Sequence, residues 1–142
     1  MYKVILIVAA ACALAGQAQA RDTRLLLSVD DAIKQGRSEG IIGDDIIFRF
    51  GKGNRGGHGK TIGTDVANRK TNALNKSDVE ACNWVFLSSL KALQEGARGV
   101  NAKAVVEIVS YYKKREFSSP TEFECHVGTL MAGVALKGSY AK

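Results

Sequence analysis

The most regular pattern in the chain is an amphipathic segment that runs from Ser77 to about residue 98. It opens with Ser77-Asp78-Val79-Glu80, a capping box in which the serine hydroxyl and the glutamate carboxylate satisfy free amides of the first turn. Apolar residues then recur at steps of three and four: Val79, Cys82, Phe86, Leu90, Leu93, Ala97 and Val100, with Trp84 and Leu87 beside them. The pattern predicts one long helix over residues 77–98, stopped near Gly99, with one face buried against another layer.

Several shorter segments have the composition of β-strands or of turns. Ser28 or Asp30 is placed to cap a short helical turn that ends near Gly36. Strands are predicted over residues 44–50, 61–66, 101–112 and 123–136, with polar residues 68–75 crossing the surface and residues 113–122 forming a hairpin loop. Gly128 and Gly133 indicate a bulge or close packing in the last strand. The fold class predicted is α+β: one long helix packed on a small, mainly antiparallel sheet.

Residues 51–63 are rich in glycine and basic side chains, which predicts a mobile basic loop. Gly59-Lys60-Thr61 matches the end of a phosphate-binding P-loop, but Asn54 stands where the first glycine is required. No helical pattern follows Thr61, since Gly63 and Asp65 come at once. We therefore do not predict a nucleotide site.

Residues 1–20 have the three parts of a cleavable signal peptide: basic Lys3, an apolar stretch, and Ala18-Gln19-Ala20 as the cleavage motif. The apolar stretch is shorter than the roughly 20 residues that span a bilayer, so no stable membrane span is expected after cleavage. The prediction is a single domain over residues 21–142, periplasmic or secreted. A lipoprotein anchored at Cys12 is the minor alternative, because no large apolar residue precedes the cysteine at the usual place.

The chain has 20 basic and 14 acidic residues, a net charge of +6, and loss of Lys3 lowers that charge by one. This excess favours acidic partners only weakly. Basic and aromatic residues do not alternate as they do in single-strand binders, so no nucleic-acid partner is expected.

Two cysteines remain after the predicted cleavage, Cys82 and Cys125. The helix runs to the far end of the domain, the next strand returns, and the last strand starts at the near end, so both cysteines are expected at the same end. Disulfides persist in exported proteins, and a Cys82–Cys125 bond is allowed. A structural bond is favoured over a redox-active pair, which is usually close in sequence.

Other chemical groups give weaker signals. Tyr111, Tyr112, Lys113, Lys114 and Arg115 form a candidate contact patch for an anionic partner or a membrane surface, or simply a basic hairpin tip. His126 is a weak candidate metal ligand, and its neighbour Cys125 points to the opposite face of a strand. No catalytic motif and no cofactor are predicted, because Asp30-Asp31 and Asp44-Asp45 adjoin turns where solvation explains them.

Several stretches resemble a family of small exported bacterial proteins often labelled "excinuclease ATPase subunit": residues 69–73, 76–84, 102–113, 123–126 and 131–138. The helix–strand–strand unit, with Gly99-Val100-Asn101-Ala102 at its turn, also resembles the YbjQ-like heavy-metal-binding family and the Rcs stress-sensor lipoprotein. The resemblance to the sensor implies a disulfide-bonded domain. The family label implies an ATPase, which the imperfect P-loop does not support.

The sequence therefore predicts a non-enzymatic protein of the cell envelope that acts through protein or surface contacts, and the resemblance to the stress sensor implies a stress-related role. Its partner would be another envelope protein, and no motif specifies the oligomeric state. The alternative is a module that binds a metal or a small ligand.

Overall fold

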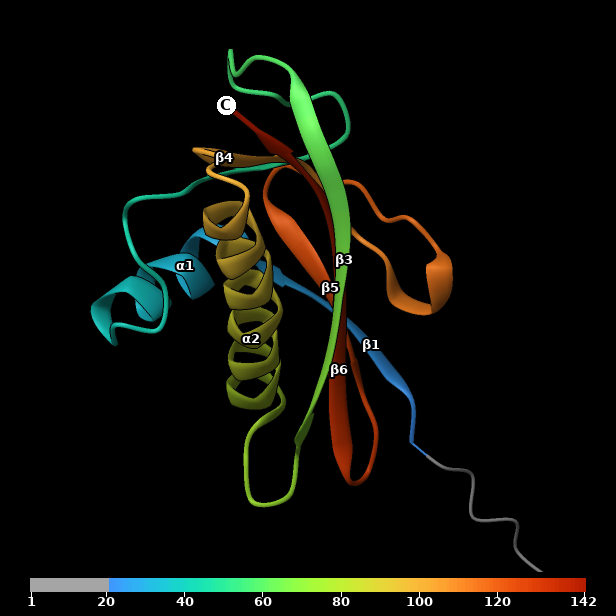
Figure 1. The fold of residues 1–142 in the computed structure, drawn as a ribbon. Coiled ribbons are helices and arrows are strands. Elements are labelled where there is room, and N and C mark those ends of the chain that lie inside the picture. Colours follow the sequence, from blue (N-terminus) through green and yellow to red (C-terminus); the bar gives the residue numbers. More distant parts are fainter. Residues whose placement is uncertain (1–20) are drawn as a thin grey trace, which may run out of the picture.

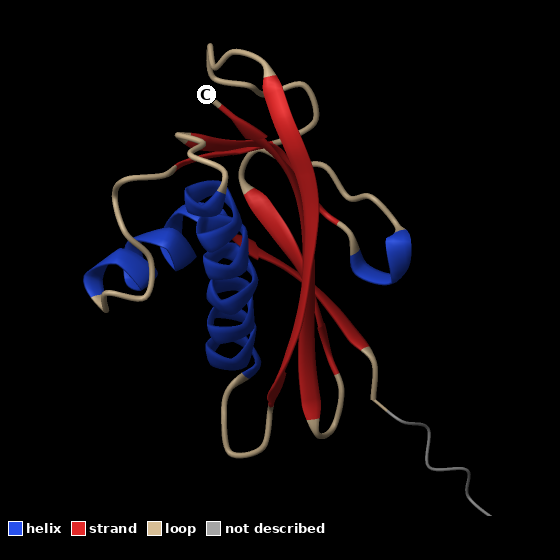
Figure 2. Ribbon diagram, in the orientation of Figure 1, coloured by secondary structure: helices blue, strands red, loops and turns tan. Residues whose placement is uncertain are grey.

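The structure is a computed structural model that describes residues 21–142. The predicted signal peptide, with Cys12, lies outside the described residues. Residues 21–142 form one α+β domain, as the sequence predicts: two helices lie on one side of a curled, mostly antiparallel sheet (Figures 1 and 2). A loop that contains a short 3-10 turn lies on the other side.

The chain order begins β1 (Thr23–Ser28), α1 (Val29–Ser38), β2 (Ile47–Phe50), β3 (Thr61–Asn72) and α2 (Asp78–Gly99). It continues with β4 (Ala104–Ser110), the 3-10 turn η1 (Tyr112–Lys114), β5 (Glu122–Val127) and β6 (Met131–Ala141).

The long strand β6 organises the sheet. β3 pairs antiparallel with it along one edge, from Asn72 opposite Met131 to Thr61 opposite Ala141. On the other edge, β4 pairs with the second half of β6 and β5 with its first half. Two short strands complete the sheet: β2 lies parallel to β4, and β1 lies antiparallel to β5.

Helix α2 covers the inner face of this sheet, and its predicted start and length are confirmed. Ser77 caps it, since the Ser77 hydroxyl accepts the Glu80 amide at 3.1 Å. Its buried face includes Phe86, Leu90 and Leu93. Three residues assigned to the apolar stripe are instead about half exposed, because they lie at its borders or ends: Val79, Trp84 and Val100.

The predicted Cys82–Cys125 disulfide is present, and both cysteines are fully buried. The route that brings them together differs from the prediction. β4 does not turn back at its end; after the η1 loop, β5 continues along the same edge of β6. Cys125 therefore lies near the end of β5, which runs antiparallel to β6, and the chain reverses direction only after β5.

The single strand predicted over residues 123–136 is wrong. β5 ends at Val127 and β6 begins at Met131, and the Gly128 amide bonds the Met131 carbonyl at 2.8 Å across the turn. Gly128 marks this reversal rather than a bulge. A Cβ there would lie 3.2 Å from the Arg21 carbonyl oxygen, so the turn packs closely on the chain that enters β1.

Other boundaries also shift. Residues 68–72 belong to β3 rather than to a surface loop, because an edge strand tolerates polar side chains. Residues 23–28 form β1, whose short apolar run was not assigned to a strand. Helix α1 is capped by Ser28, whose hydroxyl accepts the Asp31 amide at 3.1 Å, as predicted.

The glycine-rich loop is fastened to β4 rather than left without contacts. Glu107 sits at a bulge in β4 with a positive φ of 52°. Its carboxylate accepts the Gly53 amide at 3.1 Å and pairs with Arg55 at 3.0 Å, and its amide bonds the Asn54 carbonyl at 2.9 Å. The bulge thus places the Glu107 carboxylate where it can hydrogen-bond the basic loop and fix its conformation.

Candidate functional site

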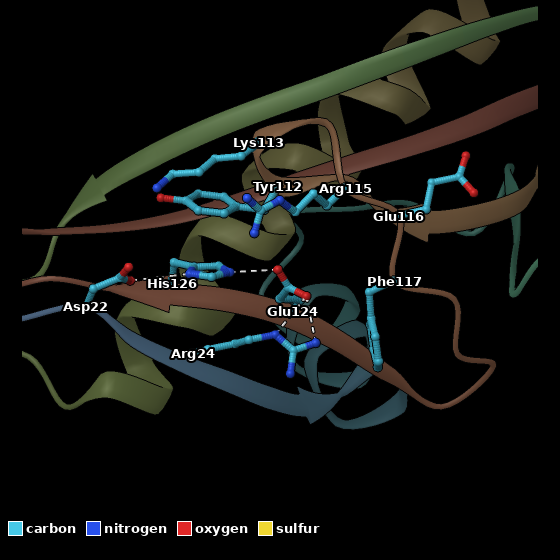
Figure 3. Close-up of a pocket in the computed structure, with 9 residues that line it drawn as sticks. All are labelled: Asp22, Arg24, Tyr112, Lys113, Arg115, Glu116, Phe117, Glu124 and His126. Atoms are coloured by element: carbon cyan, nitrogen blue, oxygen red, sulfur yellow. Dashed lines mark hydrogen bonds and ion pairs between the residues drawn. The ribbon is translucent and has the colours of Figure 1, made fainter.

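A pocket of about 300 Å³ lies on the outer face of the sheet, opposite α2 (Figure 3). Its floor is formed by β1 and β5, and its wall by the segment that carries η1. The residues that line it are Asp22, Arg24, Tyr112, Lys113, Arg115, Glu116, Phe117, Glu124 and His126.

Strand alternation explains why the floor is polar. Cys125 and Phe123 on β5 point into the core and are fully buried, so Glu124 and His126 point to the outer face. β1 lies beside β5 with Arg24 opposite His126, which places its guanidinium on the same face.

Glu124 is the centre of a polar network. Its side chain is only 9% exposed, and one carboxylate oxygen, Oε2, accepts two bonds from Arg24, at 3.0 Å from Nε and 2.8 Å from Nη2. The other oxygen, Oε1, lies 2.6 Å from His126 Nε2. The Glu124 amide donates to the Ser110 hydroxyl at 3.0 Å. Charge-assisted bonds of this kind hold side chains in one geometry.

His126 is held on every side. Its Nδ1 faces the Asp22 carboxylate at 3.4 Å, while Nε2 faces Glu124. The imidazole stacks on the Tyr112 ring, with centroids 3.8 Å apart and planes 9° from parallel. Tyr112 thereby joins the wall of the pocket to its floor.

The wall itself has an unusual backbone. Lys113 and Lys114 both have left-handed φ angles, 52° and 61°. Such angles are costly for residues other than glycine, asparagine and aspartate, so the contacts of the surrounding segment must hold the wall in this conformation. The ends of the wall are anchored by two hydrogen bonds between Ser110 and Phe117, each 2.9 Å, and by the Tyr111 amide, which bonds the Ala135 carbonyl at 2.8 Å.

Positive charge predominates around the stacked pair. A second hollow of about 280 Å³ shares Tyr112 and His126 with the first pocket, and Arg21 and Lys70 are among its lining residues. Within the described part of the chain, Lys70, Lys113 and Arg115 form no ion pair, whereas Glu124 and Asp22 both face His126. Unpaired cationic side chains therefore outnumber the carboxylates without a Lys or Arg partner at this face, of which Asp22 is one.

Three of the five residues of the predicted contact patch, Tyr112, Lys113 and Arg115, gather at the pocket. The other two are not among its lining residues: the Tyr111 ring lies 5.0 Å from Lys137 Nζ, and Lys114 belongs to the wall but does not line the pocket. Five further lining residues were not predicted from the sequence: Asp22, Arg24, Glu116, Phe117 and Glu124. The i, i+2 spacing of Glu124 and His126 was the available signal, since it places both on one face of a strand.

The described residues have neither the ligand arrangement of a metal site nor the strand–loop–helix arrangement of a P-loop. Over residues 21–142, no group of three or more His, Cys, Asp or Glu side chains is positioned to hold a metal ion. Both His126 nitrogens face carboxylates, and Cys125 is in a disulfide. Thr61 begins a strand, so no helix N-terminus follows Gly59-Lys60.

Shifted pKa values occur away from the pocket. Burial, with a hydrogen bond to Asp65, raises the pKa of Tyr140 to about 12. A hydrogen bond from Arg98 lowers the pKa of Asp45 on the surface.

Comparison with known proteins gives no relative: no family model, no curated protein and no solved structure matches the chain. None of the helices in residues 21–142 has the length and apolarity needed to cross a membrane.

Proposed function

We propose that this chain is an exported, non-enzymatic binding protein of the cell envelope. It uses the outer-face pocket to bind acidic side chains on a partner protein. The observation that carries this proposal is the strained wall at Lys113 and Lys114, which holds Lys113 and Arg115 beside the fixed Arg24–Glu124–His126 network.

The lining favours a protein partner over an enclosed small molecule. Pockets for small ligands are mostly apolar with a few polar groups, whereas this one is lined mainly by charged side chains. Arginine and tyrosine are enriched where proteins meet, because each offers a large flat surface together with hydrogen-bond donors. Arg115, Tyr112 and Phe117 provide such a surface here.

The floor of the pocket supports binding rather than catalysis. Glu124 accepts hydrogen bonds from Arg24 and lies within hydrogen-bond distance of His126, so its negative charge is largely satisfied within the chain. A network of this kind positions Tyr112 and the wall before the partner arrives, which lowers the entropy lost on binding.

The test begins with a photo-crosslinking amino acid at Lys113, with Lys34 on the exposed side of α1 as the control position. A partner that is captured at position 113 alone is purified, and its affinity is measured by calorimetry at two salt concentrations. The double variant Lys113→Ser/Arg115→Ser is expected to weaken binding about tenfold or more at low salt, with the loss shrinking at high salt. The matched variant Lys34→Ser/Lys91→Ser removes the same charge from the two helices and should bind as the unaltered protein does.

Equal binding by both double variants would refute the pocket as the contact site. The same experiment separates a small anion from a protein. If citrate or phosphate at millimolar concentration binds saturably and the protein partner does not, the small-ligand alternative replaces the proposal. Export is tested separately: the mass of protein from the envelope fraction should correspond to a chain that starts at Arg21 and has lost two hydrogens to the disulfide.

A further inference from the structure

Strand β3 is an edge strand with one side unpaired in the described part of the chain. Over residues 21–142, β6 is the only strand that pairs with it. Two side chains of β3 bond its own outward-facing peptide groups. The Val66 amide bonds Asp65 Oδ1 at 2.8 Å, and the Asn68 carbonyl accepts a bond from Arg69 Nη1 at 3.2 Å.

These contacts show which peptide groups point away from β6. The β6 residue opposite Asn68 is Ala135, and its carbonyl bonds the Tyr111 amide on the other edge of β6. In an antiparallel pair, residues alternate between those bonded to the neighbour and those that face away. Val66 and Asn68 therefore present free N–H and C=O groups to a strand that approaches the edge.

Two opposite charges of β3 lie at equal distances from Ala67. Asp65 lies two residues before it and Arg69 two residues after it, and all three side chains are on the face toward α2. An antiparallel copy of β3 centred on Ala67 would place Asp65 of each chain opposite Arg69 of the other, twice in one interface. The same register places each Val66 amide opposite an Asn68 carbonyl.

We propose that two copies of this chain form a dimer through antiparallel β3–β3 pairing about a two-fold axis at Ala67. The incoming strand displaces the Asp65 and Arg69 side chains from the peptide groups that they now bond. These side chains then pair with each other across the interface. The two sheets become continuous, and both α2 helices lie on the same face of the joined sheet.

The register is specific. A slip of two residues in either direction places Asp65 opposite Ala67 or opposite Thr71, and both ion pairs are lost. Lys70 falls opposite Thr64 in the proposed register, so no like charges meet there. β3 contains no proline, and its exposed Val66 side chain gains a neighbour on the outer face.

The opposite interpretation of the same residues is that they protect the edge. Charged side chains on an edge strand often discourage pairing with other chains. The two interpretations make different predictions, because protection requires a monomer at all concentrations, whereas complementary charges require self-association that depends on their signs.

The experiment is sedimentation velocity on residues 21–142 over a concentration range that reaches about 100 μM, where weak but specific dimers form. The unaltered chain should show a monomer–dimer equilibrium. Asp65→Arg and Arg69→Asp each place like charges together twice, and each should raise the dimer dissociation constant about thirtyfold or more. Lys34→Asp, with the same charge change as Arg69→Asp but on α1, should leave the constant unchanged.

Mixing the two variants provides the decisive result. Asp65→Arg and Arg69→Asp chains have complementary charges at both positions, so an equimolar mixture should form a heterodimer although neither variant self-associates. This outcome also shows that both variants are folded. Val66→Pro should abolish the dimer, since it removes only an amide that faces away from β6. A monomer at all concentrations, or a dimer that these variants do not alter, would overturn the proposal.

Discussion

The Cys82–Cys125 disulfide allows a quantitative prediction about stability. The two cysteines are 43 positions apart, and the bond joins the first turns of α2 to β5. On the chain-entropy account, a cross-link that closes a loop of this length stabilises the folded state by about 4 kcal/mol. Since domains of this size are stable by about 5–15 kcal/mol in total, reduction should remove a large part of the stability of this one.

Two perturbations separate the cross-link from the packing of its sulfurs. Reduction of the unaltered protein breaks the bond but keeps both sulfur atoms in the core, where they move apart to non-bonded contact. The Cys82→Ala/Cys125→Ala variant also removes those atoms from a site where both residues are fully buried. We expect the free energy of unfolding of the variant to be about 2 kcal/mol lower than that of the reduced protein.

The assay is urea unfolding, followed by far-UV circular dichroism and by the fluorescence of Trp84, the single tryptophan. The oxidation state is checked at each point by alkylation and mass spectrometry. Reduction should lower the midpoint by about 2 M urea and raise the denaturant dependence, because the unfolded chain is no longer held compact. Midpoints that coincide for the oxidised and reduced protein would refute the entropic argument.

Two further predictions concern the contact between α2 and Tyr140. A Cβ at Gly96 would lie 2.0 Å from the Tyr140 hydroxyl oxygen, whereas Gly99 has nothing within 4 Å, so in thermal unfolding Gly96→Ala should cost about 2 kcal/mol and Gly99→Ala should cost nothing or stabilise. If both variants lower the melting temperature equally, the close approach is not the cause. The raised pKa of Tyr140, about 12, predicts that stability is unaffected below pH 10, where Tyr140 is protonated in both states. Stability should then fall by up to about 1.4 kcal/mol per pH unit between pH 10 and 12, as only the unfolded chain loses the proton. Denaturant titrations of Tyr140→Phe should lack this slope, and a slope of the same size in that variant would contradict the assignment.

The sequence predicted the elements whose causes are local. The capping box at Ser77 and the three- and four-residue spacing of apolar residues determine α2 without help from other elements. The disulfide was predicted for a partly wrong reason. The two cysteines do lie at one end of the domain. However, Cys125 lies near the end of β5 and not near the start of the last strand. A strand that continues along the same edge after a loop leaves no periodic signal.

The pocket was only half predictable because it depends on strand pairing. The aromatic and basic residues of the wall are adjacent in sequence and formed a visible cluster. Arg24 and Glu124 are 100 positions apart, and they meet because β1 pairs with β5 in one register. β1 was not predicted, so its arginine could not be placed. The predicted length of β3 was too short for a related reason, since the polar residues in its second half are typical both of a loop and of an exposed edge strand.

The end-to-end arrangement of β4 and β5 has a consequence for how such a protein can change. The chain leaves the sheet after Tyr111, whose amide still bonds Ala135 of β6, and re-enters it at Glu122, which pairs with Ser28 of β1. The residues between these two points contribute little to the hydrogen bonding of the sheet. Substitutions, insertions or deletions between these two points can change the shape and charge of the pocket wall while the scaffold keeps its geometry. The chemistry of the pocket wall and the stability of the fold can therefore vary almost independently in this architecture.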